Sequence, residues 1–333
     1  MEKRIGEDLT EMTNELSKYV NNGRAVGSYA VEKEPTIGIK PEMSRIKSIK
    51  PMTSYNGRFL AVDCSTKPLK RANNWGIYLL RTAYALVSPK GKKVLWDYRE
   101  RISTAVGDAS SRGKQLENMR FEYESQLALS LIEQIEFDEK DYLLLDGASY
   151  FGRERRFSLF LYEESQKRNI RLLAIAKQSP SLLDEKGRDF MVAVEISTAR
   201  PTWVYYPYKK ANFHESLYGD ISVIKLSSST SRVFRCDIME YLTDREVVEL
   251  LSPLTSISED PRCLGYPVCL FLAHDFSKVS SHSKLLQYLD LVEEALAEKG
   301  ILDILRREEL SSNFRNELYG IKHSFEWEID WRV

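Results

Sequence analysis

Two stretches, Phe59-Leu-Ala-Val-Asp63 and Tyr142-Leu-Leu-Leu-Asp146, each end an apolar run with an aspartate. Packing alone does not explain this pattern, because an ionised carboxylate is costly to bury without a partner. Small residues follow both aspartates, at 64–66 and 147–149, so the backbone can open beside each acid. If the two strands are neighbours, their ends place two hard oxygen ligands within reach of one Mg²⁺ or Mn²⁺ ion.

The sequence around these stretches predicts alternating strands and helices. We expect strands at 58–63, 76–87 and 94–98, a turn at 88–91, a helix at 112–137, a strand at 142–146, a helix at 156–168 and a strand at 170–175. This order, with carboxylates ending the first and fourth strands, is that of the ribonuclease H-like nuclease fold. We therefore predict an α/β fold with a mixed sheet flanked by helices, similar to the Argonaute PIWI domain, with an N-terminal arm and helical C-terminal additions.

Composition excludes several classes of protein. The chain has 333 residues, of which 43% are hydrophobic and 29% charged, so it can bury a sizeable core. Its apolar run at 268–273 is far shorter than the roughly 20 residues of a membrane span, and no signal peptide follows the charged start. We expect a cytoplasmic protein with no membrane partner. The four cysteines show no zinc or disulfide spacing, which predicts reduced thiols.

Charge is nearly balanced along the chain as a whole. The formal net charge is −1, which argues against a protein that coats nucleic acid by bulk charge. Basic residues nevertheless cluster at 45–50, 67–71 and 153–156, and such patches can hold phosphates.

Four segments carry a resemblance to a known family: FLAVDCST at 59–66, LLLDGAS at 143–149, LLAIAKQS at 172–179 and LGYPVCLFLAHDFSKVS at 264–280. Together, in this order, they resemble NurA, the archaeal nuclease family that works with the hexameric ATPase HerA in processing DNA ends. The resemblance spans 58–300, which we assign as a NurA-type ribonuclease H-like nuclease domain. We assign 1–57 as an N-terminal helix and extended arm, and 301–333 as a C-terminal extension. The arm and the extension are the expected contact surfaces for other subunits.

The resemblance implies a metal-dependent DNA nuclease that uses Mn²⁺, with Mg²⁺ as the alternative, at a two-metal site. It implies 5′-to-3′ exonuclease and single-strand endonuclease activity in DNA end resection for double-strand break repair. The implied partners are DNA, a HerA-type hexameric ATPase, a second copy of the chain in a homodimer, and Mre11–Rad50, in an archaeal, nucleoid-associated setting. The chain lacks an ATP-binding phosphate loop, so a motor must come from a partner.

Asp63 and Asp146 are the first predicted metal ligands. The third carboxylate comes from the helix at 112–137, where Glu124 borders the apolar stripe; Glu122 is the alternative, and Glu117 and Glu133 read as a solvated face. His274 follows an apolar run and matches the family's C-terminal motif. We assign it as a neutral imidazole ligand or as a proton shuttle near the attacking water.

Other predicted site residues would bind the substrate. Lys177 ends a strand, where its ammonium could contact the scissile phosphate, although a surface lysine is the alternative. Tyr266 precedes a proline that restrains its backbone, and its ring could stack on a base, complete the pocket or simply pack in the core. Arg153 and Arg156 are assigned to phosphate binding. The remaining histidines read as structural: His214, His282 and His323.

Two other functions stay open. One is a catalytically inactive NurA-like subunit that binds DNA or the ATPase; its support is Cys64, which stands where the family usually has glycine. Retention of Asp63, Asp146 and His274 argues against it. The other is a different ribonuclease H-like nuclease, of the Argonaute PIWI or resolvase type, against which the C-terminal Gly-Tyr-Pro and Ala-His motifs count.

Overall fold

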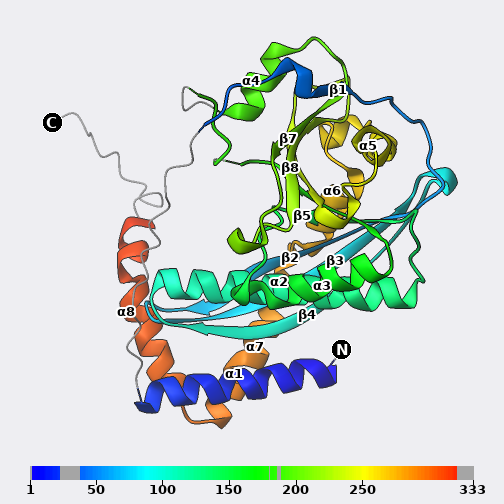
Figure 1. Ribbon diagram of the computed structural model, residues 1–333. Coiled ribbons are helices and arrows are strands. Elements are labelled where there is room, and N and C mark those ends of the chain that lie inside the picture. Colours follow the sequence, from blue (N-terminus) through cyan, green and yellow to red (C-terminus); the bar gives the residue numbers. More distant parts are fainter. Residues whose placement is uncertain (1, 23–37, 180, 186–188, 321–333) are drawn as a thin grey trace, which may run out of the picture.

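The computed structural model describes residues 2–22, 38–179, 181–185 and 189–320, and in these residues nine strands form one mixed sheet (Figure 1). Their order across the sheet is β1-β7-β8-β9-β6-β5-β2-β3-β4. The strands are β1 (Ile46–Ser48), β2 (Phe59–Arg71), β3 (Trp75–Ser88), β4 (Lys93–Val106), β5 (Tyr142–Asp146), β6 (Arg171–Ala176), β7 (Trp203–Lys209), β8 (Gly219–Lys225) and β9 (Phe234–Met239).

Eight α-helices flank the described part of this sheet. Helices α2 and α3 run side by side across one face, while α6 packs across β2 and β3 on the other (Figure 1). The helices are α1 (Glu2–Asn22), α2 (Ala109–Gln134), α3 (Arg156–Lys167), α4 (Phe190–Ser197), α5 (Val247–Thr255), α6 (Val268–Ser277), α7 (His282–Glu298) and α8 (Leu302–Gly320). No helix in the described ranges is both long and apolar enough to cross a membrane.

The predicted order of three strands, helix, strand, helix, strand is confirmed. Strands β2, β3 and β4 form an antiparallel meander, whereas β5 pairs with β2 in parallel and β6 pairs with β5 in parallel. The two parallel strands are almost wholly apolar, as expected for strands covered on both faces. The ribonuclease H-like α/β architecture therefore forms the middle of the sheet.

The prediction that the first strand ends at Asp63 is wrong. The small residues at 64–66 suggested that the first strand ends at Asp63, but β2 continues to Arg71 because β3 pairs with it along its whole length. Asp63 therefore lies inside a long strand, and only β5 ends at its aspartate. The β2–β5 pairing stops at Val62 and Leu145, so Asp63 is the first residue of β2 beyond it.

Strands β7, β8 and β9 and helix α4 were not predicted. They extend the sheet beyond β6, through an antiparallel pairing of β6 with β9. Strand β1, which falls in the predicted arm, pairs with β7, with Ile46 opposite Tyr205. Residues 46–48 of the predicted arm therefore belong to the sheet. The domain boundaries at 57/58 and 300/301 stay predictions.

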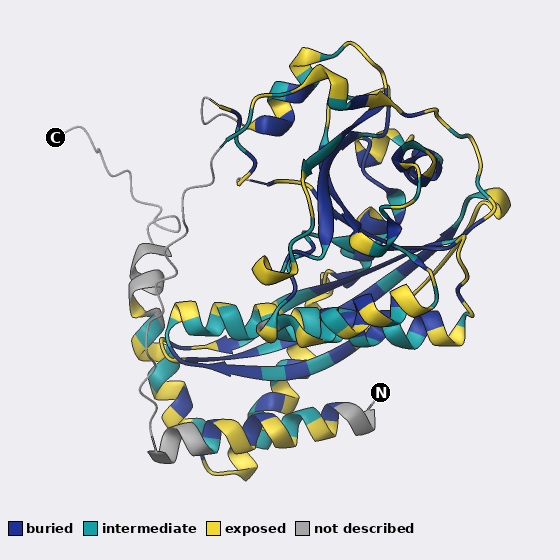
Figure 2. Cartoon of the chain, in the orientation of Figure 1, coloured by how far each residue is buried: buried dark blue, intermediate teal, exposed yellow. Residues whose placement is uncertain are grey.

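Three hydrophobic clusters hold these elements together, and the strands are the most deeply buried part of the chain (Figure 2). The largest lies between the middle strands and helices α2, α3, α5 and α6. A second joins α1, α7 and α8 to the far ends of β2, β3 and β4, with Met12 and Leu16 almost fully buried. The third packs α4 against β7 and β8. Helix α1 is thus part of the folded body. Helix α7 begins at His282, and α8 follows it.

A half-buried acid on α1 gives the first testable prediction. Asp8 accepts the backbone N–H of Ile102 at 3.1 Å, and burial, opposed by this bond, raises the pKa of Asp8 to about 6. The folded state holds this proton more tightly than the unfolded state, so the contribution of Asp8 to stability falls as pH rises from about 4 to 6. We expect Asp8→Asn to raise the free energy of unfolding by about 1–3 kcal/mol at pH 8 and to have little effect near pH 4.

Denaturant unfolding at several pH values measures this gain. Asp290→Asn is a matched control, because Asp290 is an exposed aspartate on α7. A gain in Asp8→Asn that does not change with pH would contradict the account.

Candidate metal centre

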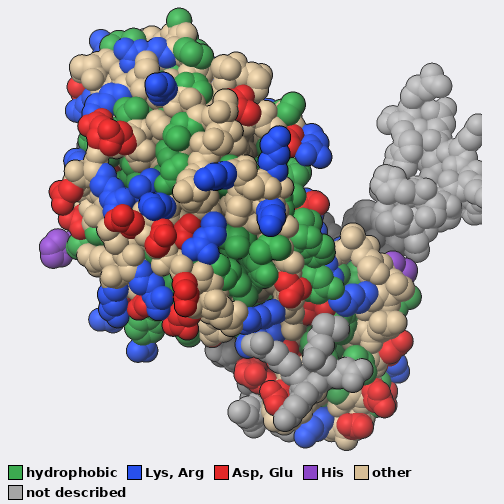
Figure 3. Space-filling view, turned by 90° about the vertical axis from the view of Figure 1, so that its right-hand side faces the viewer, with side chains coloured by type: hydrophobic (Ala, Val, Ile, Leu, Met, Phe, Trp, Pro, Cys, Tyr) green, Lys and Arg blue, Asp and Glu red, His purple; other side chains and the backbone are tan. Residues whose placement is uncertain are grey.

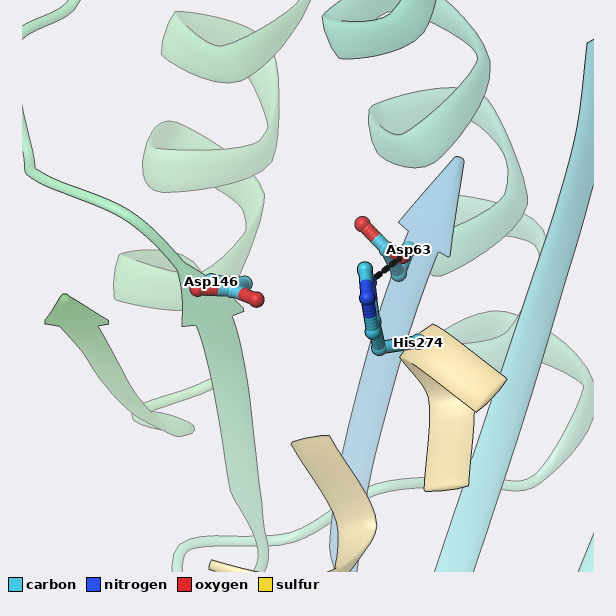
Figure 4. A group of neighbouring side chains, drawn as sticks. All are labelled: Asp63, Asp146 and His274. Atoms are coloured by element: carbon cyan, nitrogen blue, oxygen red, sulfur yellow. Dashed lines mark hydrogen bonds and ion pairs between the residues drawn. The ribbon is translucent and has the colours of Figure 1, made fainter. Parts of the chain in front are cut away.

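Asp63, Asp146 and His274 meet beside the end of β5 (Figure 4). Each offers one ligand atom, and these atoms all lie within 4.8 Å of one another. Asp63 comes from β2, Asp146 from the last position of β5 and His274 from α6. The side chains of Asp63 and His274 point toward each other, and Asp146 faces them across the gap where β5 has ended (Figure 4).

This gap exists because β5 ends while β2 continues. Gly147 follows Asp146 with a φ of +135°, a conformation that glycine adopts without strain. Its N–H donates to the carbonyl of Ile175 in β6 at 3.0 Å, so the chain leaves the edge of β2. The carboxylates of Asp63 and Asp146 thus end up on adjacent parallel strands with no strand between them.

Asp63 is buried and held by three side chains. Its Oδ2 lies 2.9 Å from Nδ1 of His274 and accepts the Ser277 hydroxyl at 2.8 Å, while Nη2 of Arg120 lies 3.7 Å from Oδ1. Burial by itself would raise the pKa of Asp63, but the hydrogen bonds from His274 and Ser277 outweigh it, so the pKa is lowered. Asp63 is therefore ionised at neutral pH.

The contact with Asp63 decides which nitrogen of His274 is free. An ionised carboxylate can only accept a hydrogen bond, so Nδ1 carries the hydrogen and Nε2 keeps its lone pair. The His274 side chain is 42% exposed, so water or an ion can approach it. A carboxylate behind a histidine fixes the orientation of the ring, as in many metal sites.

Asp146 is bound by two of the four residues that were predicted to contact the substrate. Lys177 Nζ lies 2.7 Å from Oδ2, and the Tyr266 hydroxyl donates to Oδ1 at 3.0 Å. Burial and the charge of Asp146 raise the pKa of Tyr266 well above its usual range, so it stays a donor. Its ring is only 5% exposed, which leaves little surface for stacking on a base. In this structure Tyr266 positions Asp146.

Among the glutamates of α2 considered from the sequence, Glu124 points to the site. Its Oε1 accepts the backbone N–H of Cys64 at 2.9 Å, and Arg120 lies 3.9 Å away. Burial, and then the charge of Asp63, raise the pKa of Glu124 to about 8. Glu124 is nevertheless outside the group of three ligand atoms within 4.8 Å. Its role as the third carboxylate stays a prediction.

The other candidates on α2 and at the start of α3 point elsewhere. Glu122 accepts a hydrogen bond from Gln126, one turn along the same helix, and Glu117 pairs with Arg155. Glu133 is exposed. The guanidinium groups of Arg153 and Arg156 are exposed and make no hydrogen bond or ion pair with Asp63, Asp146 or Glu124.

Cys64 does not obstruct the site. Its side chain is 0% exposed, and successive side chains of a strand point to opposite faces, so it lies on the face opposite to Asp63. Only its backbone takes part, through the N–H given to Glu124 and the carbonyl that accepts Nε of Arg120 at 2.5 Å.

A buried ion pair outside the predicted elements supports the site. Arg235 and Asp237 on β9 pair at 2.7 Å and are almost inaccessible to water. Asp237 accepts both the N–H and the hydroxyl of Ser149, three residues after Asp146, while Arg235 donates to the hydroxyl of Ser179, two residues after Lys177. One ion pair thus fixes the loops that follow Asp146 and Lys177.

Sequence reasoning missed several of these supporting residues. Ser277 lies three positions after His274 and Arg120 four before Glu124, so helical spacing could have placed each beside its neighbour. Nothing in the sequence signals Arg235 and Asp237, because their strand was not predicted and their partners lie far away along the chain.

The donor set fits a hard divalent cation. Two carboxylates with one imidazole suit Mn²⁺ or Mg²⁺, and the partial exposure of Asp146 and His274 leaves room for water ligands. Burial, and after it the charge of Asp63, raises the pKa of Glu124, and a cation among these acids would favour its ionised form.

Among solved structures, the NurA nuclease from Sulfolobus solfataricus is similar to this chain, with 17% identity and a TM-score of 0.58, covering 90% of this chain and 98% of that one. The chain has the NurA fold. NurA bound to dAMP and manganese gives 10% identity and a TM-score of 0.47, covering 83% of this chain and 92% of that one. Human endonuclease V gives 12% identity and a TM-score of 0.41, covering 76% of this chain and 93% of that one. No family model and no curated protein sequence matches the chain.

The first of these similarities confirms the predicted resemblance to NurA at the level of the fold. It covers nearly the whole of both chains. At 17% identity, what the site does must be argued from its own geometry.

Glu124 gives a prediction for the metal-free protein. Because its pKa of about 8 in the folded state lies above the ordinary glutamate value of 4.5, the folded state holds the proton more tightly, and stability falls as pH rises from 4.5 to 8. Glu124→Gln cannot ionise and can still accept from Cys64. In EDTA at pH 8, we expect it to raise the free energy of unfolding by about 1–3 kcal/mol.

Glu122→Gln is the matched control and should leave stability within about 0.5 kcal/mol of wild type. A Glu124→Gln protein that is less stable than wild type at pH 8 would contradict this account, because it would show that the ionised Glu124 carboxylate does not destabilise the folded state.

Proposed function

We propose that this protein is a divalent-metal-dependent DNA nuclease that hydrolyses phosphodiester bonds. The observation that carries the proposal is the group formed by Asp63, Asp146 and His274, with ligand atoms within 4.8 Å at the end of a parallel strand pair. This group lies in a fold shared with a solved NurA nuclease. Phosphodiester hydrolysis requires neutralised phosphate charge and a deprotonated water, which divalent ions bound by carboxylates supply.

The chain's own residues have distinct parts in this scheme. Asp63 and Asp146 would hold the metal, with Glu124 as the further carboxylate that accepts the proton or the second ion. His274 has a free Nε2 that can bind the metal or take a proton from the attacking water. Lys177, now paired with Asp146, would turn its ammonium to the phosphate once the charge of Asp146 is met by the ion.

The finer parts of the proposal rest on the resemblance to NurA. We propose Mn²⁺ as the favoured metal at a two-metal site, with Mg²⁺ as the alternative. We also propose 5′-to-3′ exonuclease and single-strand endonuclease activity in DNA end resection. The carboxylate-rich donor set supports Mn²⁺ or Mg²⁺ over softer metals but does not choose between them.

The partners are likewise proposed from the resemblance: a HerA-type hexameric ATPase, a homodimer and Mre11–Rad50. Figure 3 shows Lys and Arg side chains mixed with Asp and Glu over the face that it presents, rather than one continuous basic surface. Phosphate binding should therefore depend on a few local basic side chains and weaken as salt is raised.

A second function, a catalytically inactive subunit that binds DNA or the ATPase, has one observation in its favour. Both aspartates already have a basic neighbour, with Lys177 at 2.7 Å from Asp146 and Arg120 at 3.7 Å from Asp63. Such pairs can stabilise acids without any metal. The presence of Asp63, Asp146 and His274 together, with ligand atoms within 4.8 Å of one another, argues against this alternative.

Removal of either aspartate separates the two functions. We expect Asp63→Ala and Asp146→Ala each to lower the rate of plasmid nicking and oligonucleotide cleavage in Mn²⁺ by about 10²-fold or more, because each removes an oxygen ligand. Asp275→Ala is the matched control, since Asp275 is next to His274 but 57% exposed and outside the group of three. It should cleave at the wild-type rate, and EDTA should stop cleavage in every active protein.

A wild-type protein that binds DNA but does not cleave it in Mn²⁺ or Mg²⁺ would establish the inactive subunit. Cleavage by Asp63→Ala or Asp146→Ala near the wild-type rate would overturn the metal site itself.

The choice of the third carboxylate has its own test. We expect Glu124→Gln to lose far more activity in Mn²⁺ than Glu117→Gln, Glu122→Gln or Glu133→Gln, because Glu124 alone of these four reaches the aspartates. Initial cleavage rates at saturating metal measure this. Loss of activity in Glu122→Gln alone would move the assignment to the alternative residue and leave the rest of the site unchanged.

A further inference from the structure

The placement of α6 on the sheet decides whether His274 reaches Asp63. His274 and Ser277, which both contact Oδ2 of Asp63, belong to the last turn of α6, whereas Asp63 belongs to β2. Backbone hydrogen bonds to β3 fix β2 within the sheet, but a helix satisfies its backbone internally and makes no such pairing with strands. Side chains must therefore set the position of this turn.

Three rows of side chains on β2, β3 and β4 lie on the face that α6 covers. Residues directly opposite each other on antiparallel strands share a face, and every second residue along a strand returns to it. The face of Asp63 therefore carries the rows Ala61–Ala85–Trp96, Asp63–Ala83–Tyr98 and Ser65–Arg81–Glu100. The alanines are fully buried and leave room for the helix, and Trp96 stacks on Phe276 of α6 at 4.3 Å between ring centroids.

The third row binds the end of the helix. Nη1 of Arg81 donates to the carbonyl of Lys278, the residue that caps α6, at 2.9 Å, and the Ser65 hydroxyl donates to the carbonyl of Ser277. The last carbonyls of a helix have no partner within it, and a positive charge beside them is favourable. Two consecutive carbonyls at the end of α6 are thus bound to the sheet, one by β2 and one by β3.

Arg81 is itself fixed by Glu100. Its Nε and Nη2 donate to Oε1 of Glu100 at 2.9 and 2.7 Å, and the Glu100 side chain is inaccessible to water. Lys284 Nζ and the Tyr288 hydroxyl, both on α7, each lie 2.6 Å from Oε2. Burial by itself would raise the pKa of Glu100, but the hydrogen bonds from Lys284, Tyr288 and Arg81 outweigh it, so the pKa is lowered. One ionised carboxylate therefore fixes both Arg81 and the first turns of α7.

Stability alone does not explain this arrangement. A buried ion pair gains little free energy, because the desolvation of both charges offsets their attraction. It does provide a fixed geometry, since the planar fork of an arginine can bind Glu100 through two N–H groups and direct a third to α6.

We propose that Arg81 is a positioning residue of the candidate metal centre. By binding the carbonyl that ends α6, Arg81 sets the last turn of the helix so that Nδ1 of His274 and the Ser277 hydroxyl meet Oδ2 of Asp63. Nε2 of His274 is then left for the metal. This inference rests on the proposed nuclease function for the role of the metal, whereas the contact between His274 and Asp63 can be measured without one.

The first test is Mn²⁺ binding to full-length Arg81→Lys, measured by isothermal titration calorimetry. Lysine keeps the charge beside Glu100, but its single ammonium cannot bind Glu100 and the Lys278 carbonyl in the geometry of the arginine fork. We expect the Kd for Mn²⁺ to rise about tenfold or more, as is usual when a group that orients a metal ligand is lost.

The second test needs no metal. Spectra of ¹⁵N-histidine-labelled protein in EDTA at pH 9, where imidazole is neutral, show which ring nitrogen carries the hydrogen. Wild type should show the Nδ1–H form for His274, whose signal is identified by its loss in His274→Ala. In Arg81→Lys the share of the Nε2–H form should rise, because the hydrogen bond to Asp63 is what fixes the tautomer.

Arg58→Lys is the matched control. Arg58 likewise binds a buried carboxylate, that of Asp141, and donates from Nη1 to the carbonyl of Ile135 at the end of α2, at 2.9 Å. Its contacts lie at the other end of the sheet pairing and include none of the metal-centre residues. Both lysine variants should lower the Tm, but Arg58→Lys should keep the wild-type Kd for Mn²⁺ and the wild-type histidine spectrum.

Ser65→Ala provides a second variant that removes only one hydroxyl. It releases the other carbonyl at the end of α6, so it should shift Mn²⁺ affinity and the His274 tautomer in the same direction as Arg81→Lys, by less. This variant keeps the proposal testable if Arg81→Lys does not fold.

Failure of this inference and failure of the nuclease function give different results. Wild-type Mn²⁺ affinity and tautomer in Arg81→Lys, or in Ser65→Ala if only that variant folds, overturn the role of Arg81 and leave a DNA-cleaving wild type unaffected. Equal losses of Mn²⁺ affinity in Arg81→Lys and Arg58→Lys also overturn it, because they would reflect general stability. A wild-type protein whose Mn²⁺ affinity depends on Arg81 but which cleaves no DNA supports the inference and rejects the nuclease.

Discussion

The parallel pairing of β2 with β5 stops at Val62 and Leu145, and the candidate metal centre depends on that stop. Inside a fully paired sheet, Asp63 would be a buried acid with strands on both sides. Because β5 turns away at Gly147 while β3 holds β2 straight, Asp63 faces an opening and Asp146 lies across it. Helix α6 then covers that opening from one face and brings His274 and Ser277 to Asp63.

The acidic side chains around the opening are only partly neutralised by basic neighbours. Lys177 and Arg120 neutralise part of the charge of the two aspartates, and Asp63 is held ionised by hydrogen bonds. Glu124 has the opposite character, because burial and the neighbouring acid make its ionised form costly. A site that keeps one acid charged and another protonated near neutral pH can exchange a proton for a cation, which is the behaviour expected of a metal centre that also handles protons.

A buried ion pair fixes the loops on one side of the site, and an open groove lies on the other side. The Arg235–Asp237 pair ties the loops after β5 and β6 together through Ser149 and Ser179. Beyond Lys177 and Tyr266 the same edge opens into this groove, which has an exposed apolar wall. The strands β7 to β9, which sequence reasoning missed, supply both the ion pair and the scaffold for α4. The additions to the sheet thus hold the ligands in place and extend the site.

The sequence by itself determined the core of the sheet and its two aspartates, because apolar runs, turn residues and helical periodicity are local signals. The same signals placed Glu124 on the inner side of its helix, and the resemblance to NurA marked His274. Tertiary structure decided what local signals cannot. Pairing with β3 extends β2 past Asp63. Strand β1 joins the sheet although its own sequence does not predict a strand. Tyr266 is buried against Asp146 instead of facing a base. The partners of Arg235 and Asp237 come from distant segments, so only the folded chain shows that they support the site.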